Sequence, residues 1–413
     1  MSAPFWINAT FGAMPIGPVL RGLSGARTAR ALAAERFGLQ VDALAVDELD
    51  DDYSPWVELS ARAIEPNAFF ECGFALSASR HFLHHGRPQF VGVWRNDETG
   101  RRLVGLFPTV TPGGGDNFTQ IWLHKQAALA TPLVDRAASP DVFGAYLDWL
   151  EAETGAAGAL FPRIPAGGPA LAALMEAARR HGRAVQILEQ HARAALYPGE
   201  TADDLWQRAA HRKGLKELQR RQRRLQEMGA IGFRQFRRRD EIRDATEQFL
   251  SLEASGWKAE RGAFLSDPTL ATFVRSATRL LAAEGKCQIY SLTLDEQPIA
   301  MTILIESQGR SCLWKIAYDE RYRSQAPGVQ LVYHVTSAQL ARPEVDLTDS
   351  CAIANHPMID HVWPDRVEVA DVAVQLRSDA PRAFEDACAG ERRRRQLRAL
   401  AKRAVGFLGR KMS

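Results

Sequence analysis

The spacing of apolar residues predicts alternating helices and strands in the first half of the chain. Residues 53–85 have the spacing of two helices, which Pro66 and Asn67 separate. Short alternating runs then predict a hairpin of strands 89–94 and 102–108. The remaining pattern of this half predicts an extended run at 120–124, a helix at 142–153, a strand at 155–160, a helix at 169–181 and a closing strand at 184–197.

A long basic helix leads into the second half. Thr201 and the two acids after it form a capping signal, and the helix continues to a stop at Gly229. Leu218 and Leu225 share one stripe while arginines fill the rest, so one face packs and the other stays cationic. The pattern then predicts strand 231–236, helices 240–255 and 268–284, a meander of strands 287–294, 298–306 and 311–318, helix 328–340, buried strand 345–348 and strands near 367–376.

The length of 413 residues predicts two domains, since one core stops growing near ~250–300 residues. Both halves have the same order of a helix pair, antiparallel strands, a helix and a further strand, which indicates a duplicated α/β architecture. The predicted units are an N-terminal arm at 1–40, a first domain at 41–200, a connecting helix at 201–230, a second domain at 231–385 and a basic amphipathic tail at 386–413.

Composition indicates an ordinary globular protein. Apolar residues make up 46% and charged residues 24%, and no apolar run is long enough for a spanning helix. The five cysteines have no metal-binding spacing, and the first residues lack a signal-peptide pattern, so we expect free thiols and a cytoplasmic location. The arginines and the absence of acids in residues 1–34 leave a transit peptide as the alternative to an ordinary arm.

The net charge is only +3, but basic residues gather in two runs, 208–239 and 392–411. The first run is either a solvated brace between domains or a docking surface for tRNA, a nucleotide sugar or an anionic second messenger. The tail, with Leu397, Leu400 and Phe407 among its basic residues, either lies on an anionic membrane or packs on its own domain. Peripheral contact with the inner membrane is therefore one expectation.

A turn before the helix at 328–340 has the features of an anion site. Residues 325–330 read Gln-Ala-Pro-Gly-Val-Gln, and a helix N-terminus offers free N–H groups where a small residue permits close approach. Lys315, Arg321 and Arg323 are near in sequence. An ordinary turn is the alternative for the Pro-Gly pair. Its position after a strand and before a helix favours a site for a phosphate-bearing donor.

Several segments of the second half resemble a known family. Ser251-Leu-Glu-Ala-Ser-Gly-Trp-Lys, Pro298-Ile-Ala-Met, the run 313–323 and Ala326-Pro-Gly resemble the acetyltransferase domain of CelD-like proteins. These are GNAT proteins related to the Fem-type aminoacyl transferases. Together with weaker similarity in the first half, the resemblance covers roughly residues 50–375.

The resemblance implies two tandem GNAT-like domains, each with a mixed, mostly antiparallel sheet flanked by helices. It implies transfer of an acyl group from acetyl-CoA or another acyl-CoA, without a metal, to an amine on a sugar or another polysaccharide or envelope precursor. Gln325 and Gly328 match the family's donor loop, whereas Gln330 stands where a small residue is usual. A Fem-like transfer from charged tRNA and a non-catalytic module that binds an anionic ligand are the alternatives. Apart from tRNA, no nucleic acid is expected as a partner.

Acyl transfer requires carbonyl polarisation, an acid and a base. The backbone N–H groups of Ile316 and Ala317 are the candidates for the first task, Tyr318 for the acid and Asp349 for the base. Packing of Tyr318 and turn capping by Asp349 are the structural alternatives. The predicted donor contacts are Ile316, Ala317, Arg323, Gln325, Pro327, Gly328 and Val329.

The predicted acceptor pocket contains Glu253, Trp257 and Lys258, with the indole as a stacking platform and the ammonium as an anion clamp. A core position for Trp257 and a solvated one for Lys258 remain open. Lys315 stands in mid-strand, an unusual place that favours a catalytic cleft. His81 and His85 share a helical face but lack a third ligand, so no metal is expected.

Overall fold

The computed structural model describes residues 38–44, 53–82, 88–98, 100–111, 118–255 and 262–411. Most of the predicted arm at 1–40 thus lies outside the described residues. None of the described helices combines the length and the apolar content that crossing a bilayer requires.

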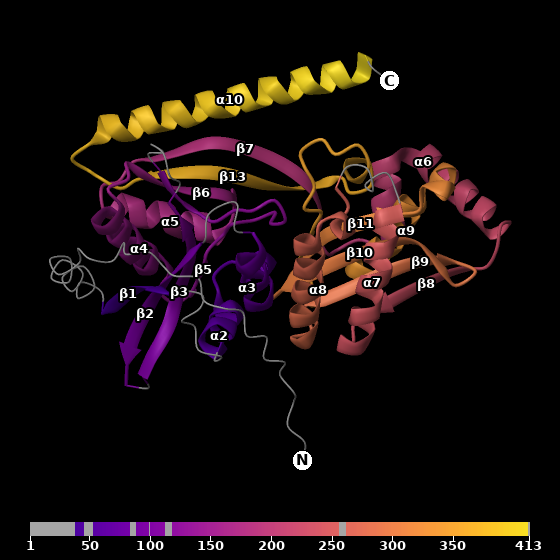
Figure 1. The fold of residues 1–413 in the computed structure, drawn as a ribbon, viewed down its shortest axis with the longest axis horizontal. Coiled ribbons are helices and arrows are strands. Elements are labelled where there is room, and N and C mark those ends of the chain that lie inside the picture. Colours follow the sequence, from indigo (N-terminus) through magenta and orange to yellow (C-terminus); the bar gives the residue numbers. More distant parts are fainter. Residues whose placement is uncertain are drawn as a thin grey trace.

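The first half alternates strands and helices (Figure 1). Its elements are β1 (Leu39–Leu44), α2 (Ser54–Arg62), the 3-10 helix η2 (Ala68–Phe70), α3 (Cys72–His81), β2 (Gln89–Asp97), β3 (Gly100–Val110), β4 (Phe118–Ile121), β5 (Leu133–Val134), α4 (Ser139–Thr154), β6 (Gly158–Pro165), α5 (Pro169–Arg180) and β7 (Val185–Leu196).

The second half repeats much of this order. Its elements are α6 (Ala202–Gln226), β8 (Ile231–Phe236), α7 (Arg239–Ser255), η5 (Phe264–Ser266), α8 (Pro268–Ala283), β9 (Cys287–Leu294), β10 (Gln297–Ser307), β11 (Arg310–Tyr318), η6 (Glu320–Gln325), α9 (Pro327–Leu340), β12 (Leu347–Asp349), η7 (Ile359–His361), β13 (Asp365–Gln375) and α10 (Pro381–Lys411).

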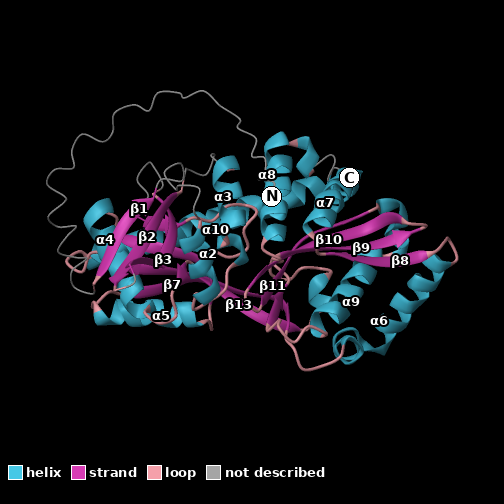
Figure 2. Cartoon of the chain, turned by 90° about the horizontal axis from the view of Figure 1, so that it is seen from below, coloured by secondary structure: helices cyan, strands magenta, loops and turns pink. Residues whose placement is uncertain are grey.

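The predicted fold class, a mixed and mostly antiparallel α/β arrangement, is confirmed. The strands form one continuous sheet in the order β1-β2-β3-β4-β6-β13-β7-β12-β11-β10-β9-β8, with β5 beside β3. Among the described strands, only β4 with β6 and β11 with β12 run parallel. In the second half, α7 and α8 cover one face of the sheet and α6 and α9 the other (Figure 2).

Two long strands join the halves. Strand β13 belongs to the second half of the chain, yet it pairs with β6 and β7 of the first half. Strand β7 in turn pairs with β12 of the second half. The sequence predicted a separate sheet for each domain, whereas hydrogen bonds continue from one half into the other. The proposed domain limits remain a prediction.

Helices from the two halves also pack closely. A Cβ atom on Gly73 of α3 would lie 2.7 Å from the Cβ of Leu280 on α8, so only glycine allows this approach. Ion pairs with a buried carboxylate and a partly buried basic residue cross the same interface, including Lys286 with Glu71 at 2.8 Å and Arg310 with Glu65 at 3.2 Å. Such pairs are costly to break, because each partner alone would be a buried charge without compensation.

The pH dependence of stability should contain a contribution from His334. This residue of α9 lies against Phe233 of β8, and burial lowers its pKa from 6.5 to about 4. The unfolded chain therefore takes up this proton before the folded chain does, and stability falls as the pH drops from 6.5 towards 4. Urea denaturation at pH 7 and pH 5 should show a smaller loss for His334→Gln than for the parent chain. An equal loss in both would contradict this assignment.

Candidate active site

The sheet opens between β11 and β12. These parallel strands pair only at Arg310 with Leu347, Ser311 with Thr348 and Cys312 with Asp349. Strand β12 ends there, whereas β11 continues to Tyr318. The second part of β11 therefore runs on beyond its neighbour, and the two chain segments diverge.

A β-bulge lies at the start of the part of β11 that no longer pairs with β12. In the ladder with β10, Ile303 faces Lys315 and Leu304 faces Leu313, so Trp314 is the extra residue. Bulges bend a strand and redirect its side chains, and they are frequent next to active sites. The indole N–H of Trp314 donates to the backbone oxygen of Gln126 at 2.8 Å, which fixes the bulge against the first half.

Helix α9 begins next to this strand without a side-chain cap. Its N-cap, Ala326, has a left-handed φ of 50°, and Pro327 follows at the first helical position. Gly328 lies under the strand: a Cβ atom added there would be 3.5 Å from Cδ1 of Tyr318 and 3.8 Å from Cδ1 of Ile316. The positive end of the helix dipole is thus placed at the end of β11.

Gln330, the residue that departs from the family's loop pattern, stabilises this turn. Its side-chain amide is buried and donates to the backbone oxygen of Gln325 at 2.8 Å. The longer side chain therefore closes the loop from inside, while Gly328 is buried beneath Tyr318 and Ile316. The departure at position 330 is compatible with a donor loop.

A cavity of about 480 Å³ opens beside the start of α9. Three segments surround it: helix α6, the first turn of α9 and the chain around η7. The indole N–H of Trp206 is buried and has no hydrogen-bond partner among the described residues. The lining residues are Trp206, Gly214, Glu217, Leu218, Arg221, Ala326, Val329, Pro357, Met358, His361 and Val362. The helix start therefore faces open space between packed elements.

The structure brings most of the predicted donor contacts together. Ile316 and Tyr318 pack on the α9 side of the sheet, next to Gly328, and Val329 lines the cavity. Arg323 is exposed on η6. The remaining predicted contacts, Ala317, Gln325 and Pro327, lie on β11, at the end of η6 and at the start of α9.

Asp349, the predicted base, is engaged by another side chain. Arg193 of β7 binds both of its carboxylate oxygens, at 2.7 Å and 2.5 Å, and the N–H of Cys351 donates to it at 2.9 Å. Burial alone lowers the pKa of Arg193, but the adjacent carboxylate reverses this and raises it. This geometry favours a role for Asp349 in joining the halves. Its role as the base stays a prediction.

Lys315 and Glu253 lie on the opposite side of the sheet from α9, around the ring of Phe264. The ammonium of Lys315 is 5.5 Å from the ring centre of Phe264, and the carboxylate of Glu253 accepts the N–H of Phe264 at 2.8 Å. These predicted catalytic and acceptor residues are therefore neighbours in space. Trp257 and Lys258, the other predicted acceptor residues, lie outside the described residues.

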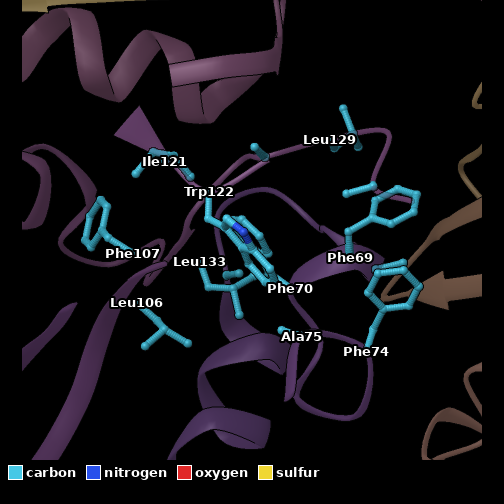
Figure 3. Close-up of a cluster of buried hydrophobic side chains, with 14 of the residues drawn as sticks. Phe69, Phe70, Phe74, Ala75, Leu106, Phe107, Ile121, Trp122, Leu129 and Leu133 are labelled. Atoms are coloured by element: carbon cyan, nitrogen blue, oxygen red, sulfur yellow. The ribbon is translucent and has the colours of Figure 1, made fainter. Parts of the chain in front are cut away.

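The equivalent place in the first half is filled by side chains. Strands β4 and β6 also pair in parallel over three positions, as β11 and β12 do. Beyond β4, however, the buried Trp122 packs at the centre of an apolar cluster with Phe70 and Leu133 (Figure 3). Helix α4 carries Asp141 in its first turn, which disfavours an anion there. The open site thus belongs to the second half.

No local pattern in the sequence indicates Arg193, Trp206 or Gln126, although each contributes to the site or its support. Each acts through a partner more than 60 residues away or through a cavity that only the fold creates.

For the histidine pair considered for a metal, Nδ1 of His81 lies 2.6 Å from the backbone oxygen of Ser77, and His85 lies outside the described residues. The described part of the chain contains no cluster of three or more metal-binding side chains.

Comparisons with known proteins agree with this geometry. Residues 212–350, which include β11, η6 and α9, match the family model described as an acetyltransferase (GNAT) domain. FemX shares the fold with a TM-score of 0.53 and 9% identity, over 81% of this chain and 96% of its own. A conserved protein of unknown function from Bacteroides thetaiotaomicron gives a TM-score of 0.51 and 11% identity, over 81% and 99%. No curated protein matches the chain.

Residues 212–350 of the second half therefore match a GNAT acetyltransferase domain, and the fold of most of the chain is similar to that of FemX. The narrower resemblance to CelD-like proteins stays a prediction.

Breaking the Arg193–Asp349 pair should destabilise the fold. Arg193→Met would leave a buried carboxylate uncompensated, a cost of about 3–5 kcal/mol in the free energy of unfolding. Arg179→Met, which removes an exposed ion pair with Glu176, is the matched control and should have no measurable effect on the denaturation midpoint. Asp349→Asn separates the two roles of the carboxylate. Asp349→Asn leaves the buried Arg193 without its counter-charge and should lose stability in either case, whereas a lower kcat in the folded fraction is expected only if Asp349 is also the base.

Proposed function

We propose that the second half of this protein is an N-acyltransferase that moves an acyl group from acyl-CoA to an amine. The observation that carries the proposal is the uncapped start of α9, which borders a cavity between α6 and the chain around η7 and contacts the diverging part of β11 through Gly328. A pyrophosphate needs backbone N–H donors at the positive end of a helix, and the start of α9 supplies that end together with the N–H of Gly328, which has no backbone acceptor among the described residues. The matching GNAT domain supports the same donor.

The reaction that fits the site is direct transfer. The amine nitrogen attacks the thioester carbonyl carbon, the C–S bond breaks, and the thiolate of CoA takes up a proton. Tyr318, at the end of β11 and above Gly328, is the proposed proton donor to the leaving sulfur. The proton released by the amine passes to solvent, because both oxygens of Asp349 are already bound to Arg193.

We propose that the acceptor approaches from the α7 and α8 side of the sheet, opposite the donor. Lys315 and Glu253 lie on that side next to Phe264, where an ammonium and a carboxylate suit a polar acceptor. An amine on a sugar or another envelope precursor agrees with the resemblance found in the sequence, and the proposed location of the reaction is the cytoplasm.

A Fem-like transfer from charged tRNA is the second candidate. The fold shared with FemX and the exposed arginines of α6, among them Arg220, Arg223 and Arg224, favour it. The proposed donor distinguishes the two: acetyl-CoA should bind and raise the apparent stability in the first case, and charged tRNA in the second. A response to neither ligand would favour a module without catalytic activity.

Gly328 provides the sharpest test of the donor site. Gly328→Val places methyl groups against Tyr318 and Ile316 and into the approach to the helix start, so it should remove the thermal shift produced by acetyl-CoA and reduce transfer at least 100-fold. Gly167→Val is the matched control, because a Cβ atom there meets nothing within 4 Å. Normal binding of acetyl-CoA by a folded Gly328→Val variant would refute the proposed site.

Tyr318→Phe tests the proton donor separately. Removal of the hydroxyl keeps the ring that packs on Gly328, so donor affinity should stay unchanged while kcat falls by ~10²–10⁴. A variant with unchanged kcat would assign Tyr318 to packing alone. Steady-state kinetics with a free-thiol reagent for released CoA measures both parameters.

A further inference from the structure

Helix α10 is fixed to the molecule at its beginning. Phe384, Ala387 and Cys388 pack in a small apolar cluster with residues of β4, β6 and β13. Arg395 then forms ion pairs with Asp371 of β13 at 2.5 Å and with Glu189 of β7 at 2.8 Å. In Figure 1 the helix runs along the outside of the molecule, next to β7 and β13.

Apolar side chains become exposed directly after this attachment. Leu397 is 66% and Leu400 is 59% exposed. They lie three positions apart on a helix, so they occupy the same face. Leucines on a helix that only packed on its own domain would be covered, as Phe384 is at 1% exposure. This face of α10 therefore has no partner among the described residues.

The sequence of the same helix is strongly basic. Between residues 392 and 411 there is no Asp or Glu, and the basic residues are Arg392, Arg393, Arg394, Arg395, Arg398, Lys402, Arg403, Arg410 and Lys411. Exposed leucines and a cationic helix without acids are the features of helices that lie in a membrane interface, where apolar side chains enter the acyl boundary and cations meet anionic headgroups.

The exposed leucines and the basic residues together distinguish among three partners: a nucleic acid, a second copy of α10 and an anionic bilayer. A nucleic acid would be attracted by the charge, but its phosphate backbone offers nothing that buries Leu397 and Leu400. A second copy of α10 would cover the leucines, but it would bring two strongly basic helices together without acids to compensate. A bilayer that contains anionic lipids satisfies both features.

We propose that α10 binds the surface of an anionic lipid bilayer through the face that carries Leu397 and Leu400. The ion pairs of Arg395 hold the start of the helix, so the membrane would lie on the β7 and β13 side of the molecule. This proposal is independent of the transfer reaction proposed above, because it rests on residues outside the GNAT domain match.

Vesicle flotation with the full-length chain tests the proposal. The protein should float with vesicles that contain about one third phosphatidylglycerol in phosphatidylcholine, and it should stay behind with pure phosphatidylcholine. Binding should weaken at high salt, since the headgroup attraction is screened. Leu397→Glu combined with Leu400→Glu should lower the fraction bound at least tenfold. The matched control is Met175→Glu on α5, which is 48% exposed and should bind as the parent does.

Four results would overturn the proposal. The first is no flotation with phosphatidylglycerol vesicles, and the second is an equal loss in the control and the double variant. The third is binding of total tRNA that is as tight as vesicle binding and insensitive to the two leucines, which would identify α10 as a nucleic-acid surface. Light scattering of the parent chain must also show a monomer, because a dimer that the double variant abolishes would assign the leucines to a second copy.

Discussion

Strand β7 is the element on which the rest of the structure depends. It pairs with β13 along one edge and with the short β12 along the other, so its backbone hydrogen bonds connect the halves on both sides. At the same position Arg193 of β7 binds Asp349, the last residue of β12. This pair fixes where β12 stops, and β11 beyond that point borders the proposed donor site. The interactions of β7 that join the halves are therefore also those that border the opening between β11 and β12.

The two halves use a similar order of elements in different ways. In both, two parallel strands pair over three positions before the chain continues. In the second half, a cavity lies beside the start of α9, which no side chain caps. In the first half Trp122 and its apolar neighbours occupy the corresponding region, which supplies buried surface and close packing instead of a binding site. The first half thus stabilises and positions the second.

Local patterns in the sequence predicted the elements well. Strands Ile231–Phe236 and Cys287–Leu294 were predicted with their observed limits, and the Thr201 cap is present, with its side chain accepting the N–H of Asp204. Strand β1 and the short η5, η6 and η7 were missed, because a short strand or a single 3-10 turn carries little periodicity. The pairing of β13 with β6 of the first half could not be predicted from the sequence. Pairing between strands about 200 residues apart leaves no trace in local spacing.

The order of synthesis gives β13 a further significance. Residues 365–375 are synthesised after both β6 and β7, yet they complete the sheet of the first half between these two strands. Until then, β6 and β7 each present an unpaired edge, the kind of edge that pairs wrongly with other chains. A nascent or truncated chain that lacks β13 would therefore hold two incomplete half-sheets, and aggregation during translation competes with the final closure.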